Sequence, residues 1–231
     1  MIASAIRDAL DVALARACLR CGDRGAVLCA ICEHALSASP MVTRVDGVPV
    51  ASCGAYSGAL RDAILDYKVH GSRALAPALA RLLAVAVVLA DRVGASCDSP
   101  ERTMVVPIPG HARPARGFAA LDDITRHLPP SLPAHLAVTP ILALARGYRP
   151  VKGQSRRARA EAVRGSMLCR EHRAPLQRAI LIDDVLTTGA TVREGMRALS
   201  ARGITTVAIA VLASPGTRAM PHAPARATLP R

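Results

Sequence analysis

The residues from Ile180 to Val192 combine acidic, hydroxyl and glycine positions in an order that can bind an anionic ligand. An apolar run leads into the adjacent carboxylates of Asp183 and Asp184, and a threonine-rich turn separates them from an expected helix. Adjacent carboxylates repel one another unless a ligand or a cation lies between them. We expect the backbone N–H groups from Leu186 to Thr191, the threonine hydroxyls and the positive end of the helix to hold one phosphate group without a lysine.

A plain helix start is the competing interpretation of the same segment. Thr191 could cap the helix, and Glu194, three residues later, completes a capping-box pattern. This interpretation explains Thr191 and Glu194, but it does not explain two carboxylates at the end of a strand. We therefore favour a ligand site and expect the capping box to be part of it.

Four of the seven cysteines form a second cluster, made of two C-x-x-C pairs that are seven residues apart: Cys18, Cys21, Cys29 and Cys32. Two such pairs can complete a tetrahedral site, and the metal lowers the thiol pKa values so that the ligands bind as thiolates. A redox motif of the thioredoxin type, or plain buried thiols, are the alternatives. We expect structural zinc here, and isolated buried thiols at Cys53, Cys97 and Cys169.

The spacing of apolar residues predicts a mixed α/β chain around these clusters. Apolar positions recur at helical spacing in residues 1–17, 56–68 and 75–93, and residues 42–50 form a strand-like run. From residue 103 onward strands and helices alternate, which is typical of a parallel sheet flanked by helices. In that part we expect strands at 103–108, 138–145, 179–182 and 204–212, and helices at 119–127 and 192–199.

Composition excludes several classes of protein. Of 231 residues, 51% are hydrophobic, which excludes intrinsic disorder. The best candidate for a membrane span, Leu82 to Ala90, has nine residues, whereas a span needs about 20. Arg7, Asp8 and Asp11 interrupt the apolar stretch that a signal peptide would need. We therefore expect no membrane insertion and a cytoplasmic location.

The net charge of +13 is unevenly distributed. Arginine supplies 28 of the 30 basic residues, and 45 alanines accompany it, so codon bias in a GC-rich genome is one hypothesis for the excess. Residues 146–178 nevertheless carry a net charge of +8, from ten basic and two acidic residues. That stretch is either a solvated surface or a binding segment, for a phosphate-rich ligand first and a long nucleic acid second.

The segment from Ile180 to Val192 resembles the phosphoribosyl-pyrophosphate (PRPP) binding motif of type I phosphoribosyltransferases, with its apolar strand, two acidic residues and T-T-G-x-T turn. The resemblance implies a type I phosphoribosyltransferase-like parallel sheet flanked by helices. It implies that Asp183 and Asp184 are catalytic and contact the ribose hydroxyls of PRPP, with Mg²⁺ on the pyrophosphate. It assigns PRPP binding, and the 5-phosphate in particular, to the turn: Val185, Leu186, Thr187, Thr188, Gly189, Ala190 and Thr191.

Further stretches are similar to the ComF competence protein family, in which a zinc knuckle precedes such a domain. Residues 56–71 resemble the family's Y…L…I…K-x-x-G helix, and Val105-Val-Pro-Ile-Pro109 with Arg-Gly-Phe118 resembles its V-P-V-P…R…R-G-F segment. Leu144-Ala-Arg146, with Gln154 and Arg164, resembles a later L-x-R…Q…R stretch. This resemblance implies that four residues belong to a pyrophosphate loop and a mobile loop: Arg113, Arg116, Arg146 and Gln154.

Two places depart from the family pattern. Ala119 and Ala120 stand where the family usually continues with Asn-Gln, and Arg164-Gly165 occupies the region of an expected Arg-x-x-Asn. If the missing amides contact substrate, their loss affects activity while the phosphate site stays intact.

The resemblance leads to two hypotheses of different classes. One is a phosphoribosyltransferase that displaces pyrophosphate from PRPP through an oxocarbenium-like state, with an acceptor that the sequence does not specify. The other is a non-catalytic factor of DNA uptake that binds single-stranded DNA or a helicase-like ATPase, with a zinc module that contacts DNA or only stabilises the fold. The expected parts are an N-terminal helix and zinc knuckle (1–40), a helical linker or hood (41–102), the core (103–213) and a flexible tail (214–231).

Overall fold

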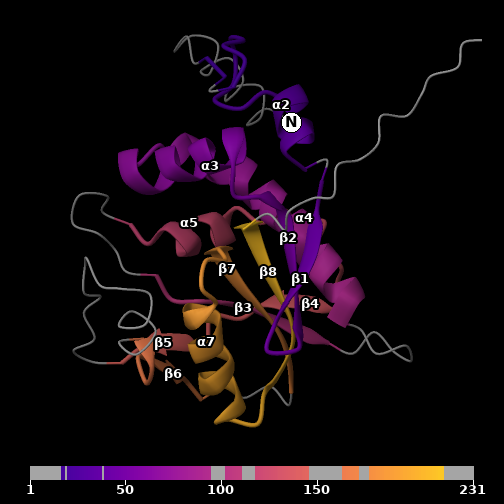
Figure 1. Ribbon diagram of the computed structural model, residues 1–231, viewed down its shortest axis with the longest axis vertical. Helices are drawn as coiled ribbons and strands as arrows, with labels where there is room; N and C mark the ends of the chain where they lie inside the picture. The colour runs from indigo at the N-terminus through magenta and orange to yellow at the C-terminus, as the bar shows by residue number, and fades with distance from the viewer. Residues whose placement is uncertain are drawn as a thin grey trace, which may run out of the picture.

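The computed structural model describes residues 17–18, 20–37, 39–94, 102–110, 118–145, 163–171 and 177–215. The strands of its central sheet are β1 (Met41–Val45), β2 (Val48–Ala55), β3 (Thr103–Pro107), β4 (Leu136–Val138), β7 (Arg178–Val185) and β8 (Thr205–Ser214). They lie in the order β1-β2-β8-β7-β3-β4 (Figure 1). Only the β1–β2 pair of this sheet is antiparallel. The expected α/β class, a parallel sheet flanked by helices, is confirmed.

Helices cover both faces of the sheet, and its central strand β7 is accordingly buried from Ala179 to Ile182. On one face, α4 (Ala76–Gly94) packs against β2, β7 and β8, and its last residue, Gly94, approaches Ala208 closely. On the opposite face lies α7 (Ala190–Ser200), in which Gly195 is so close to Leu181 that an added Cβ would lie 2.8 Å from the leucine side chain. Both faces of β7 are therefore sealed, and only its ends can bind a ligand.

The other helices that the structure describes are short and precede or connect the strands of the sheet. They are α2 (Ala30–Ser37), α3 (Gly58–Leu65), the π-helical turn η1 (Asp66–His70), the 3₁₀ turn η2 (Arg73–Leu75) and α5 (Ala120–Arg126). The helix expected at 56–68 is thus α3 continued by η1, and it ends at Gly71, whose φ of 74° is one that glycine adopts readily. The helices expected at 75–93 and 119–127 are present as α4 and α5.

The strands differ from the expectation in three places. The run 138–145 is divided between β4 and β5 (Leu142–Leu144), because the chain leaves the central sheet at Thr139-Pro140. β5 instead pairs with β6 (Met167–Cys169). The sequence pattern did not predict β6, because the residues around it are polar and basic. The segment 41–102, expected as a helical linker or hood, also contributes β1 and β2 to the central sheet. The domain boundaries themselves stay a prediction, and the expected N-terminal helix and most of the tail lie outside the described residues.

The segment Arg73–Gly94 is long and apolar enough to cross a membrane, with a mean hydropathy of 1.9. In the structure 61% of its most apolar window is buried inside the protein. The buried residues face β2 and β8, so this hydropathy belongs to a core helix packed on the sheet.

Candidate functional site: the acidic end of strand β7

The two adjacent carboxylates lie at the carboxyl end of β7, flanked by the ends of two parallel neighbours. Ile182 pairs with Pro107 of β3, and Asp183 pairs with Val211 of β8. The carboxyl ends of parallel strands are where open α/β sheets bind ligands. The strand continues through both aspartates to Val185, three residues beyond its expected end. The acidic pair is therefore held by sheet hydrogen bonding and not by a loop.

Burial and repulsion make this pair electrostatically costly. Burial, and then the charge of Asp184, raise the pKa of Asp183 to about 7, against the opposing effects of the Asp184 N–H and Lys68. Asp183 Oδ1 accepts that N–H at 2.8 Å, and Lys68 Nζ lies 2.6 Å from Asp184 Oδ2. Among the described residues, one ammonium group therefore faces two carboxylates. This imbalance of charge is typical of a site to which a bound ligand adds the missing partner.

The turn after β7 presents backbone donors, although fewer than expected. The Leu186 N–H is bonded to Ala213 O of β8 at 2.9 Å, so the prediction that it faces a ligand is wrong. Among the described residues, none accepts the N–H groups of Thr187, Thr188 and Gly189. With the start of α7 at Ala190, these three donors form a concentrated positive site for an anion.

A guanidinium group fixes this turn from the side. Arg193 of α7 donates to both carboxylate oxygens of Asp46, at 2.9 and 3.0 Å, and to Thr188 O at 2.9 Å. Asp46 is in the tight turn between β1 and β2, so the hairpin and the threonine turn are joined through one side chain. Val45 also lies beside Gly189, within 3.4 Å of where its Cβ would be.

The expected capping box is not formed. The N-cap residue of α7 is Gly189, with a φ of 75°, and no side chain caps the helix. Glu194 is buried and accepts the Met167 N–H at 3.0 Å and two N–H groups of Arg197 at 2.8 Å. The glutamate is therefore used to attach strand β6 to α7, and Thr191 is left inside the first turn.

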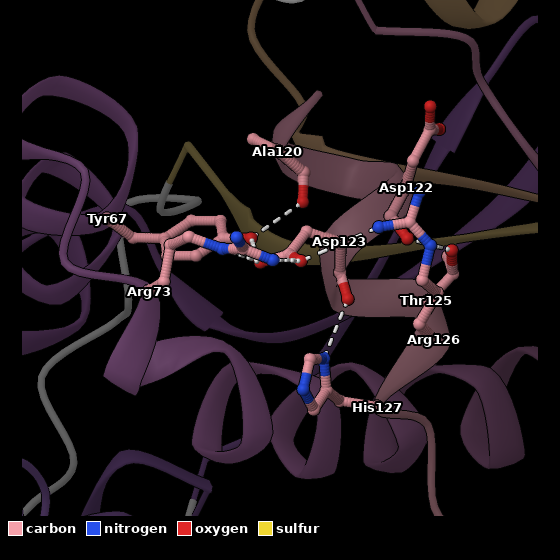
Figure 2. A network of polar contacts seen from close by, with 8 residues as sticks. All are labelled: Tyr67, Arg73, Ala120, Asp122, Asp123, Thr125, Arg126 and His127. Atoms are coloured by element: carbon pink, nitrogen blue, oxygen red, sulfur yellow. Dashed lines mark hydrogen bonds and ion pairs between the residues drawn. The ribbon is translucent and has the colours of Figure 1, made fainter. Parts of the chain in front are cut away.

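A second polar network is centred on the buried carboxylate of Asp123 (Figure 2). Asp123 of α5 is 1% exposed and accepts from Arg73 at 2.6 Å and from the Tyr67 hydroxyl at 2.8 Å. Burial opposes ionisation of this carboxyl, but the hydrogen bonds from Arg73 and Tyr67 outweigh it and lower its pKa. The Phe118 ring packs against both partners, 5.4 Å from the Tyr67 ring and 5.2 Å from the Arg73 guanidinium. This network ties α5 to η1 and η2.

The comparison with protein families agrees with this arrangement. A model of the phosphoribosyl transferase domain family matches residues 70–227, more than half of the chain, and these include β7, the threonine turn and α7. The chain belongs to the phosphoribosyl transferase domain family. No curated protein matches the sequence. The matched phosphoribosyl transferase domain starts after the four-cysteine cluster, which is thus an addition to it.

The four cysteines, which precede the phosphoribosyl transferase domain in the sequence, lie close together in the structure. The Sγ atoms of Cys18, Cys21, Cys29 and Cys32 all lie within 4.8 Å of one another. Cys21 and Cys29 are separated by 3.7 Å, close to the roughly 3.8 Å between sulfurs that a tetrahedral zinc site with 2.3 Å bonds requires. The cluster could therefore hold a metal ion such as zinc. None of these cysteines forms a disulfide with another described cysteine.

The thiols of this cluster are unequal. Burial opposes ionisation of Cys18, but the N–H groups of Cys29, Cys21 and Arg20 outweigh it and lower its pKa to about 6. Burial and the neighbouring sulfurs raise the pKa of Cys32 to about 12. A full set of thiolates therefore needs a cation among them, which is the role of zinc in four-cysteine sites. Cys53 and Cys169 are buried apart from the cluster, as expected, and Cys97 lies outside the described residues.

The sequence-predicted loop residues lie outside the part of the chain that the structure describes: Arg113, Arg116, Arg146 and Gln154. Lys68 is the residue at the acidic pair that sequence reasoning did not assign. A compositional signal could have found it, because it is one of two lysines in a chain with 28 arginines.

Proposed function

We propose that this protein is a ComF family phosphoribosyltransferase that binds PRPP with Mg²⁺ and transfers the phosphoribosyl group to an acceptor yet to be identified. One observation carries the proposal. Within a domain of the phosphoribosyl transferase family, two carboxylates at a strand end are followed at once by a turn with three unpartnered N–H groups among the described residues. That order matches a ligand with ribose hydroxyls next to a terminal phosphate.

Each part of the site has a separate task in this proposal. Asp183 and Asp184 accept hydrogen bonds from the ribose hydroxyls and orient the ring. The turn from Val185 to Thr191 holds the 5-phosphate through the N–H groups of Thr187, Thr188 and Gly189. These donors lie at the start of α7, where the partial positive charge of the helix is located. Fixing both ends of the phosphoribosyl group leaves C1 positioned for displacement of pyrophosphate.

The charge of the site favours a metal-bound form of the substrate. Two carboxylates with one described ammonium partner would repel a bare pyrophosphate, whereas a magnesium complex is less negative. Mg²⁺ supplies stabilisation of the charge that develops on the leaving pyrophosphate. By the family resemblance, Arg113 and Arg116 would add charge beside the leaving group, and Arg146 and Gln154 would belong to the closing loop.

The four-cysteine cluster takes the role of a structural zinc site in this proposal. Its ligands fill all four positions and leave none for a substrate. Glu33 of α2 accepts from Arg81 of α4 through two hydrogen bonds of 2.6 Å, so the cluster is attached to the core helix.

Calorimetric titration with PRPP and Mg²⁺ tests the proposed function. We expect the wild type to bind and Asp184→Asn to bind about 10- to 100-fold more weakly, since one charged acceptor is removed. Asp62→Asn, an exposed aspartate of α3, is the matched control and should bind as the wild type does. Absence of binding heat in the wild type would refute the proposal.

The alternative function, binding of single-stranded DNA or of a helicase-like ATPase, depends on the basic segment 146–178. Most of that segment lies outside the described residues, so it offers no geometric support. Binding to DNA through arginine–phosphate contacts would weaken steeply with salt. A salt titration with single-stranded DNA separates this alternative from PRPP binding.

A further inference from the structure

Lys68 occupies an unusual backbone position next to the acidic pair. It lies in η1, the π-helical turn that continues α3 and ends at Gly71. Single π-turns are rare and often occur at functional sites. The Lys68 side chain is 32% exposed and that of Asp184 17% exposed, so their 2.6 Å contact is partly shielded from water.

The residue before Lys68 is fixed in the core. Tyr67 is fully buried, and its hydroxyl lies 3.0 Å from Ala120 O and 2.8 Å from Asp123 Oδ2 (Figure 2). Arg73 reaches the same carboxylate from the next turn. The backbone that carries Lys68 is thus held against α5, and its ammonium group reaches β7 from a rigid base.

The contact matters because of what surrounds Asp184. Asp183, its neighbour in the strand, is a half-buried carboxyl that is repelled by Asp184. Among the described residues, Lys68 is the cation that contacts the pair. Without this contact the Asp184 carboxylate, repelled by Asp183, would turn toward water, and the site would lose an oriented acceptor.

We propose that Lys68 is a positioning residue for ribose recognition, which holds the Asp184 carboxylate in the orientation that faces the ribose hydroxyls. The inference rests on the proposed function, because it concerns the same site. It adds a residue from outside the matched domain, which begins at residue 70. The ligand class is a ribose 5-phosphate with a free pair of ring hydroxyls.

The test compares Lys68→Met, Lys68→Arg, Asp184→Asn and the double variant Lys68→Met/Asp184→Asn, each titrated with PRPP and Mg²⁺. We expect Lys68→Met to weaken binding about tenfold and Lys68→Arg to restore most of it, because a cation within reach of Asp184 is what matters. The double variant should bind no more weakly than Asp184→Asn alone, since Lys68 acts through that carboxylate. His70→Ala, which removes the side-chain hydrogen bond between His70 and Asp66 in the same turn, is the control and should bind normally.

Magnesium pyrophosphate, which lacks ribose, is the second probe. Its affinity should be equal in the wild type and in Lys68→Met, whereas a lysine that touches the pyrophosphate itself would change it and overturn the inference. Additive losses in the double variant, or wild-type affinity in Lys68→Met, also overturn it. Failure of the wild type to bind PRPP overturns the proposed function as well. Thermal unfolding of each variant verifies that it is folded.

Discussion

The cysteine cluster and the acidic end of β7 both gather groups that repel one another when ionised, but they are completed in different ways. Four sulfurs lie within 4.8 Å of one another, which is the full ligand set of a tetrahedral zinc site. The two aspartates share one ammonium partner among the described residues and lie beside three N–H groups that no described residue accepts. We call the first arrangement closed, because the cysteines alone supply every ligand of a structural ion, and the second open, because a substrate can supply the missing partners.

The two clusters also differ in the secondary structure that carries their residues. The cysteines come from turns and the first residues of α2, a region with few apolar residues in the core. The aspartates come from a strand that is buried on both faces and paired on both edges. A site built on such a strand keeps its shape without a ligand, whereas a site built on turns depends on its ion.

Disruption of the four-cysteine cluster should have the largest effect. We expect Cys32→Ser to lose zinc and to lower the free energy of unfolding by at least about 4 kcal/mol, because binding energy at such a site is folding energy. Metal analysis and thermal unfolding measure both. Cys53→Ala, a buried thiol outside the cluster, should keep full zinc content. A wild type without zinc, together with unchanged stability of Cys32→Ser, would contradict the closed-site interpretation.

A substitution in the threonine turn should have an intermediate effect. Gly189→Ala places a side chain at a φ of 75° and a Cβ 3.1 Å from Arg193 Nη1. We expect a loss of about 1 to 2 kcal/mol in the free energy of unfolding. Chemical denaturation measures it, with Gly203→Ala as the control for positive φ, because there nothing lies within 4 Å of the added Cβ. Equal losses in the two variants would show that the contact with Arg193 contributes nothing.

The smallest effect should be a pH dependence of stability at Asp183. Its pKa of about 7 is above the ordinary carboxyl value of 3.8, so the folded state binds this proton more tightly than the unfolded state does. The stability it contributes is present below pH 3.8 and is lost as the pH rises to about 7. Asp183→Asn lacks this loss, so its advantage over the wild type should grow by about 1 kcal/mol between pH 6 and 7. If the free energies of unfolding of the two proteins changed in parallel from pH 5 to 8, the pKa of Asp183 would not be raised in the folded state.

The sequence predicted the local elements of the site better than its long-range contacts. Strand β7, the turn and α7 follow from apolar periodicity and turn residues within one short segment. The pairing of β2 with β8 joins Val50 to Ile209, and no local pattern can indicate a partner so far along the chain. Glu194 matched a capping box by spacing, but its carboxylate binds Met167 and Arg197 instead, because strand β6 comes within reach. The Lys68–Asp184 contact was missed for the same reason.

The position of β8 has a consequence for biosynthesis. This strand lies between β2 and β7, so the sheet stays in two separate pieces until residues 205–214 have left the ribosome. The β1–β2 hairpin and the four cysteines emerge early and must wait through about 150 residues of synthesis, which takes roughly 10 to 30 seconds at 5 to 20 residues per second. During that time β2 exposes the edge that β8 later covers. An ion bound early by the four cysteines would keep the first part of the chain ordered while the closing strand is being made.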